Sequence, residues 1–210
     1  MDIAAISKTC AAHQLDVFGV VDGDNDTSIV LLGPKEPGFW VHFQSSPEAQ
    51  DGKQDPLDRW SARVISHLAA ECGARALFPF GGPPYQPFIR WAMESGRAWQ
   101  SPAGPLVHDT AGMMVSYRGA LEFPDRISTP TPPVCPCTVC TDKPCLTACP
   151  VNALSAETGY DLTACHSHLD TPQGQDCMTT GCAARRACPV SARYGRLPEQ
   201  SAFHMKAFHP

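Results

Sequence analysis

The first part of the chain carries its apolar residues in short runs, each with the spacing of a helix or a strand. Apolar residues recur at helical spacing over residues 3–14, which predicts an opening helix. Two further apolar runs, at 16–21 and 28–32, flank the polar sequence DGDND, and together they predict a β-hairpin. The turn lacks the ligand spacing and the terminal Glu of a calcium-binding loop, so we interpret it as a turn only.

The strongest pattern in the chain is that of a helix over residues 55–72. Asp55 stands at the expected N-cap, Pro56 at the first helical position and Gly73 directly after the end. Six residues form an apolar stripe along this helix: Leu57, Trp60, Val64, Ile65, Leu68 and Cys72. The stripe predicts that one face of the helix packs on a core.

Three more elements follow in the same half of the chain. The patterns predict a strand at 74–80, a helix at 87–95 and a strand at 111–121. Residues 33–55 are rich in Gly, Pro and polar residues around the aromatic sequence FWVHF, and we assign no element to them. Helices between strands indicate a layered arrangement, so the predicted fold class is α+β, with a compact α/β module over 1–123.

A proline-rich stretch separates this module from the rest of the chain. Five prolines fall within residues 124–136, and such a run is neither a helix nor a central strand. It predicts a semi-rigid connector. The second module therefore spans 137–210, and its tail at 201–209 is expected to form one or two amphipathic turns.

Charge and hydropathy narrow the classes of function. The net charge of −5 and the pI near 5.9 argue against binding nucleic acid through its phosphates. No apolar run approaches the roughly 20 residues of a membrane-spanning helix, and the opening residues lack the pattern of a secretion signal. We therefore expect a cytoplasmic protein with no membrane or nucleic-acid partner. In that compartment its cysteines are expected to be thiolate ligands rather than disulfides.

Eight of the eleven cysteines lie between Cys137 and Pro189, in two groups of four. The first group has the spacing C-x2-C-x4-C-x3-CP and the second C-x11-C-x4-C-x5-CP. A 4Fe–4S cube needs four thiolates, and a short spacing places two or three of them on one loop. The Cys-Pro ending of both groups is typical of a protein with two 4Fe–4S clusters, and it predicts a ferredoxin-like module.

In two-cluster ferredoxins the cysteine before the proline ligates the other cluster. Applied here, this crossed pattern assigns cluster one to Cys137, Cys140, Cys145 and Cys188. It assigns cluster two to Cys149, Cys165, Cys177 and Cys182. The spacings are longer than the usual ones, so the uncrossed assignment, in which each group holds its own cluster, remains open.

Structural zinc is the main alternative for these cysteines. Tetrathiolate zinc sites usually show two separated Cys-x2-Cys pairs, whereas this chain has one. The spacing and the compartment together favour iron–sulfur clusters over zinc or disulfides. Cys10 and Cys72 lie on predicted apolar helix faces and are interpreted as small buried hydrophobes. Cys135 is interpreted as a spare thiol beside the first group.

Four charged or titratable residues flank the proposed ligands. His166 and His168 follow Cys165, and they are expected to lie around the site rather than to ligate metal. Arg185 and Arg186 lie in the second group, where they would stabilise a negatively charged cluster, dock an acidic redox partner, or form a solvated helix face.

The block Cys137–Pro150 followed by VNAL, together with residues 94–123, resembles the epoxyqueuosine reductase and reductive dehalogenase superfamily. In that superfamily a flavin-reductase-like, nitroreductase-related cobalamin domain precedes a two-cluster ferredoxin module. The chain departs from the family pattern at three positions. Arg90 stands near the place of the catalytic Asp, Ala98 replaces a glycine, and Pro102 replaces a lysine. The resemblance therefore implies a shortened relative that retains the electron-transfer half, without chemistry on tRNA.

Three hypotheses follow. The first is an electron-transfer protein that passes single electrons to a redox partner protein, a small-molecule acceptor or a site on the N-terminal module. The second is an oxidoreductase with cobalamin or flavin in a pocket formed by Arg97, Trp99, His108 and Tyr117. In this second hypothesis the pair His108–Asp109 is either a general acid–base pair or a polar turn. The third is a redox or iron sensor whose clusters staple the fold. No catalytic residue is assigned.

Overall fold

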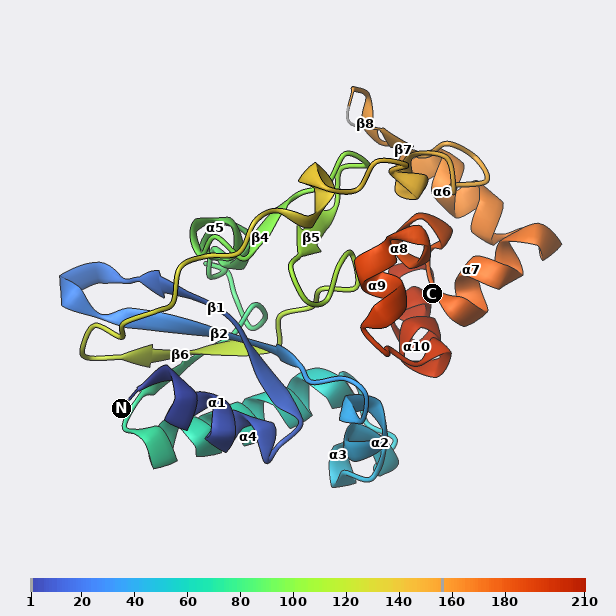
Figure 1. Ribbon diagram of the computed structural model, residues 1–210. Coiled ribbons are helices and arrows are strands. Elements are labelled where there is room, and N and C mark those ends of the chain that lie inside the picture. The colour runs from blue at the N-terminus through green and yellow to red at the C-terminus, as the bar shows by residue number, and fades with distance from the viewer. Residues whose placement is uncertain (1, 156) are drawn as a thin grey trace. The chain divides into compact units, whose positions relative to one another are not determined.

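A computed structural model describes residues 2–155 and 157–210 (Figure 1). The chain divides into two compact units. The first unit comprises the residues up to Arg97 together with Ser116–Pro133, and the second comprises Ala98–Val115 with Val134–Pro210. The boundary at 133 and 134 lies in the predicted connector. Residues 98–115 belong to the second unit, although the sequence pattern grouped them with the N-terminal module.

The first unit is built on a four-stranded antiparallel sheet, which confirms the α+β class. The strand order is β1 (Leu15–Asp22), β2 (Ser28–Pro34), β6 (Gly119–Phe123) and β3 (Arg75–Leu77). The predicted hairpin is present, since β1 pairs with β2 from Leu15 opposite Pro34 to Asp22 opposite Ser28. A short 3₁₀ turn, η1 (Asp24–Asp26), closes it.

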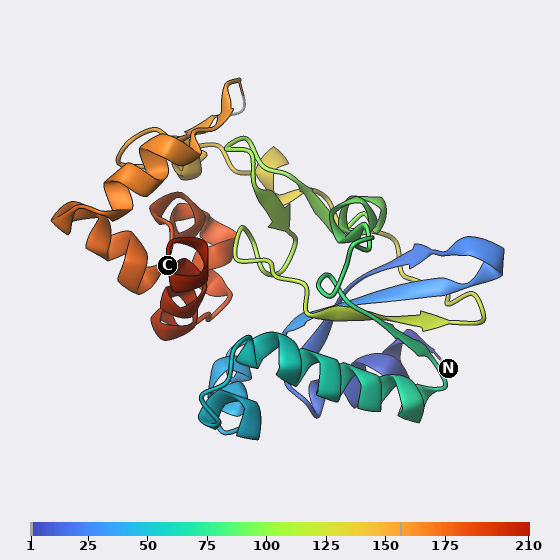
Figure 2. The same cartoon turned by 180° about the vertical axis from the view of Figure 1, so that it is seen from behind.

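Helices cover both faces of this sheet. Figures 1 and 2 show α1 (Ile3–Ala11) and α4 (Pro56–Cys72) on one face and α5 (Phe88–Glu94) on the other. Strand β2 is buried at all seven positions, as expected for a central strand with both faces covered. The core of the unit therefore lies on both sides of β2.

Helix α4 shows where the predicted helix signals succeed and where one fails. Its predicted apolar stripe is buried except for half-exposed Cys72, and Gly73 ends the helix in the left-handed conformation at φ 68°. Asp55, however, makes no side-chain cap. Its own φ is 50°, whereas a capping residue has an extended backbone that aims its side chain at the first helical amides. The expected cap is therefore wrong.

The segment 33–55, to which we assigned no element, contains two short helices. These are α2 (Phe39–Gln44) and α3 (Pro47–Gln50). Phe39 and Phe43 of α2 pack edge-on against Trp60, with ring centroids 5.3 and 6.2 Å apart. The aromatic run is helical because its rings pack against the stripe of α4.

The predicted strand over 111–121 is correct only at its end, in β6. Before it, His108 and Gly112 form an isolated bridge, and Gly112 adopts φ 56°, so the chain turns there. The carbonyls of residues 113–115 then accept hydrogen bonds from arginine side chains instead of from a neighbouring strand. The run is apolar because it is buried, not because it is extended.

The second unit consists of short elements. Strands β4 (Ala98–Gln100) and β5 (Leu106–His108) form one hairpin, and β7 (Leu154–Ser155) and β8 (Gly159–Tyr160) form another. The helical segments are η2 (Pro136–Thr138), η3 (Pro144–Leu146), α6 (Leu162–Leu169), η4 (Pro172–Gly174), α7 (Gln175–Thr180), α8 (Ala183–Ala187), α9 (Pro189–Arg193) and α10 (Pro198–Phe208). The tail thus forms a longer helix than the one or two turns expected.

Among the residues that the structure describes, no helix has both the length and the apolar character needed to cross a membrane.

Candidate metal centre

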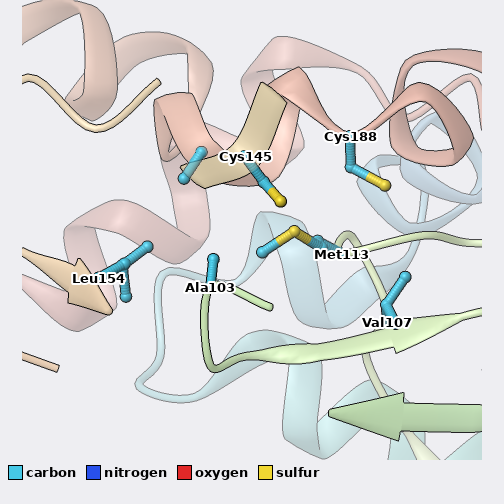
Figure 3. Close-up of a cluster of buried hydrophobic side chains, with 7 residues drawn as sticks. Ala103, Val107, Met113, Cys145, Leu154 and Cys188 are labelled. Carbon is cyan, nitrogen blue, oxygen red and sulfur yellow. The ribbon is translucent and has the colours of Figure 1, made fainter. Parts of the chain in front are cut away.

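The core of the second unit is small, and it includes cysteines of the proposed ligand groups. Ala103, Val107 and Met113 pack on one side of it, against Cys145, Leu154, Ala184 and Cys188. Figure 3 shows Cys145 and Cys188 coming from separate helical segments, with Met113 beneath them. All seven residues are buried, so the thiols lie where water has little access.

One cavity of about 410 Å³, which we call cavity A, has four cysteines in its lining: Cys137, Cys140, Cys145 and Cys188. Three come from the first group and one from the second. Val107 and Met113 form a buried, apolar part of the cavity wall. The charged residues in this lining are Asp142, Lys143 and Arg193, and all three are exposed. Cavity A thus joins two buried thiols, Cys145 and Cys188, and two half-buried thiols, Cys137 and Cys140, to a solvated rim.

A second cavity of about 570 Å³, cavity B, is lined by the complementary set: Cys149, Cys165, Cys177 and Cys182. Here one cysteine comes from the first group and three from the second. The two cavities therefore contain the two sets that the crossed assignment names. Which sulfur binds which iron stays a prediction.

The Cys-Pro steps shape the chain around these cavities. Cys188 has an extended backbone, with φ −62° and ψ 124°, as the following proline requires. It ends α8, and Pro189 begins α9 at a position where a missing N–H costs nothing. The chain therefore bends at the cysteine, between the two helices. Cys182 has a similar extended backbone before α8.

Burial disfavours thiolates in both cavities. It raises the pKa of Cys137 to about 11, with neighbouring cysteines adding to the shift. Burial likewise raises the pKa of Cys145, Cys165 and Cys177. Thiols with a raised pKa give up their protons to a strongly attracting cation, as metal ligands do.

Polar groups around cavity B point at sulfur. The Tyr160 hydroxyl donates to Cys165 Sγ at 3.2 Å, and the Ala153 amide donates to Cys149 Sγ at 3.3 Å. His168 lines the cavity, and its buried Nε2 has no hydrogen-bond partner within the described chain. A buried nitrogen without a partner costs about 1–3 kcal/mol. A sulfur-rich group in the cavity would supply an acceptor, so the residues present fit a 4Fe–4S cluster.

A single metal ion needs a different arrangement of ligands from a cluster. Within residues 2–155 and 157–210, no three His, Cys, Asp or Glu side chains form a group that could hold one ion. A tetrahedral zinc ion needs its ligands about 2.0–2.3 Å from one point. A cube takes each thiolate on a different iron, so its ligands surround a volume. The cysteines line two volumes.

The flanking residues divide between structural and cavity positions. Arg186 pairs with Asp176 and donates to the Gly181 carbonyl at 2.9 Å, which fits the solvated helix face. Arg185 lines cavity B instead. His166 is absent from the lining of cavity B, and its Nδ1 lies 2.7 Å from Nδ1 of His209.

The three remaining cysteines lie outside the linings of both cavities. Cys10 is fully buried, and burial raises its pKa to about 12, as expected for an inert core thiol. Cys72 is half-buried, and burial also raises its pKa. Cys135 neighbours Cys137 without joining cavity A.

The four residues predicted to form a cobalamin or flavin pocket are split between the units. Arg97 and Tyr117 belong to the first unit, and Trp99 and His108 to the second. None of them lines cavity A or cavity B. Arg97 donates to the Val17 carbonyl at 2.7 Å.

The other three pocket candidates have local contacts. Tyr117 packs edge-on against Phe18, and Trp99 packs against the core of the second unit. Nδ1 of buried His108 lies 3.1 Å from the neighbouring Asp109 carboxylate, within the turn. This contact fits a polar turn, and the pocket itself stays a prediction.

Sequence reasoning missed Tyr160, whose hydroxyl reaches a proposed ligand. The signal was weak, because the hydroxyl meets Cys165 through the hairpin of β7 and β8 and not through helical spacing. It also missed the contribution of residues 98–115, which supply Ala103, Val107 and Met113 to the core beside the cysteines.

Comparisons with protein-family models, with curated proteins and with solved structures found no match to this chain. The resemblance to the epoxyqueuosine reductase and reductive dehalogenase superfamily therefore stays a prediction that depends on the cysteine spacing and on residues 94–123.

Proposed function

We propose that this protein is an electron-transfer protein with one 4Fe–4S cluster in cavity A and one in cavity B. The observation that carries the proposal is the division of eight cysteines between two cavities, four to each, with each set drawn from both sequence groups. Four thiolates around one volume are the ligand set of a 4Fe–4S cluster.

The clusters would supply one-electron redox chemistry, and the protein would supply binding and electrostatics. Buried apolar residues such as Val107 and Met113 keep water from the thiols of cavity A. Donors to sulfur, such as the Tyr160 hydroxyl, stabilise negative charge on the ligands of cavity B. Cys149 and Cys188 exchange partners between the groups, so the two sites are expected to assemble together.

The proposed partner, cellular compartment and domain types are those that the sequence predicts. The partner is a redox protein or a small-molecule acceptor, and the protein is cytoplasmic and binds no nucleic acid. Its second unit is a ferredoxin-like module. The first is a reduced relative of the flavin-reductase and nitroreductase domains, whose sheet is four-stranded here.

The test is anaerobic reconstitution with iron and sulfide, followed by counting both elements per chain. Two clusters of four irons give about eight irons and about eight sulfides. Two zinc ions per chain with no sulfide would refute the proposal. Cys135→Ser is the matched control, because Cys135 lies outside both cavity linings and its loss is expected to leave the count unchanged.

The crossed assignment has its own test. Cys188→Ser removes one ligand from cavity A, and Cys149→Ser removes one from cavity B. Under the crossed assignment, the spectrum that changes in Cys188→Ser is the one that also changes in Cys140→Ser. If Cys188→Ser instead alters the signal altered by Cys165→Ser, the uncrossed assignment holds.

A further inference from the structure

Arg185 is a cation placed in the wall of cavity B. It lies on α8, between Cys182 and Cys188, and its side chain is among those that line the cavity. Its Nε donates to the Met113 carbonyl at 2.5 Å, and its Nη2 lies 3.4 Å from the Val115 carbonyl. Two backbone carbonyls therefore fix the guanidinium in place.

No carboxylate of the described residues is paired with this charge. Among the described residues, Arg185 forms no ion pair, whereas the adjacent Arg186 pairs with Asp176. Burial lowers the pKa of Arg185, but a guanidinium stays protonated at neutral pH. The guanidinium has five N–H donors, and its two hydrogen bonds leave three of them without a partner among residues 2–155 and 157–210. A partly buried cation of this kind requires a negative partner.

The charges at cavity A differ in kind. Lys143 and Arg193 are exposed there, and the carboxylate of Asp142 lies in the same lining. Exposed charges are screened by water and salt, so they act weakly on a buried group. Arg185 is held partly out of water, where its field is stronger.

We propose that Arg185 is the counter-charge of the cluster in cavity B, and that it sets the reduction potential of that cluster above that of the cluster in cavity A. Reduction adds one electron, and so one negative charge, to a cluster; the electron comes from the redox partner or, in the test, from dithionite. A fixed cation stabilises the added charge. The first electron to enter the protein would therefore rest in cavity B. This inference depends on the proposed function.

The experiment is a redox titration of the anaerobically reconstituted full chain, followed by electron paramagnetic resonance. Signals are assigned with Cys165→Ser, which perturbs cavity B, and Cys140→Ser, which perturbs cavity A. In the chain with its native arginines, the signal of cavity B is expected to appear at the higher potential. If the signal of cavity A appears first, the inference is wrong.

Arg185→Met then tests whether the charge of Arg185 raises the reduction potential of the cluster in cavity B. At a fixed potential, it should lower the ratio of reduced to oxidised cluster in cavity B roughly tenfold, which is ~59 mV for one electron, and leave cavity A unchanged. Arg185→Lys should retain most of the ratio. Arg186→Met is the matched control. It removes the same charge from the neighbouring position, but the side chain that it removes is paired with Asp176.

Failure of the inference is distinguishable from failure of the proposed function. Suppose that the native chain and Arg185→Met both bind about eight irons, and that the cluster in cavity B has the same reduction potential in both. That result overturns the inference and leaves the proposed function standing. A chain that takes up no sulfide overturns the proposed function. If Arg185→Met loses its clusters, the order of reduction in the native chain and in Arg185→Lys still decides the matter.

Discussion

In the first unit strand β2 is buried at every position, whereas in the second unit the buried core includes two proposed ligands, Cys145 and Cys188. The first unit has a 17-residue helix with a continuous apolar stripe over a four-stranded sheet. The longest helix of the second unit has 11 residues, and its sheets have two strands each. Isolated two-stranded hairpins are at best marginally stable in water.

From this difference we expect the two units to be stabilised by different forces. Burial of apolar surface is sufficient for the first, as in ordinary domains. Much of the core of the second consists of thiols and of the residues around two cavities, so its stability is expected to come from the metal.

Removal of iron should have the largest effect. Chelation of a reconstituted sample should abolish amide-exchange protection in the second unit and leave protection in β2 intact, because metal binding in such sites is folding free energy. Hydrogen exchange followed by mass spectrometry resolves the two. Equal protection of residues 157–210 before and after chelation would show that the second unit folds without its clusters.

A void introduced into the core of the first unit should have the opposite effect: it should destabilise that unit and leave iron binding unchanged. Leu31 is fully buried in β2, and Leu31→Ala is expected to cost about 2–5 kcal/mol of unfolding free energy, since it removes methyl groups and leaves a void. Urea unfolding measures this cost, and the iron content per folded chain should stay unchanged. Val41→Ala is the control, because Val41 is 64% exposed. A loss of iron in Leu31→Ala would mean that the units do not fold independently.

The same contrast explains which parts of the fold were predictable. The hairpin and α4 follow from local spacing and from breakers such as Gly73, whose effect needs no distant partner. The strand over 111–121 failed because the Met113 and Val115 carbonyls accept from Arg185, about 70 residues away in the sequence. Helix α2 was missed because its aromatic run depends on Trp60 for packing.

In the candidate site, too, some features could be predicted from the sequence and others could not. The two sets of four cysteines follow from the Cys-Pro spacing, and at Cys188 the following proline requires an extended backbone and a bend. The groups around the thiols do not follow from it. Tyr160 reaches Cys165 through a hairpin, and the charge of Arg185 becomes significant only because no carboxylate in the described chain pairs with it.

Acid should weaken the first unit through one buried carboxylate. A hydrogen bond from the Arg63 guanidinium lowers the pKa of Glu48 to about 2, well below its usual value near 4.5. A depressed folded-state pKa gives stability that is present above about pH 4.5 and is lost as the pH falls towards 2. Since Arg63 is half-exposed, we expect about 1–2 kcal/mol.

Glu48→Gln measures this contribution. The variant should be less stable than the native chain at pH 7, and the difference should shrink as the pH falls from 4.5 towards 2. Urea unfolding followed by tryptophan fluorescence reports it, because three of the four tryptophans lie in the first unit. A difference that is constant over that pH range would show that the carboxylate charge is not the source.

The smallest effect is expected from a single hydrogen bond in the second unit. Tyr160→Phe removes the hydroxyl that donates to Cys165 Sγ at 3.2 Å and keeps the ring that stacks near Phe208. A donor to sulfur stabilises the reduced, more negative cluster, so its loss should lower the potential of cavity B by the equivalent of about 1 kcal/mol. A redox titration measures the shift, and the potential of cavity A is the internal control. An equal shift in both cavities would place the effect in the fold of the unit rather than in the bond to Cys165.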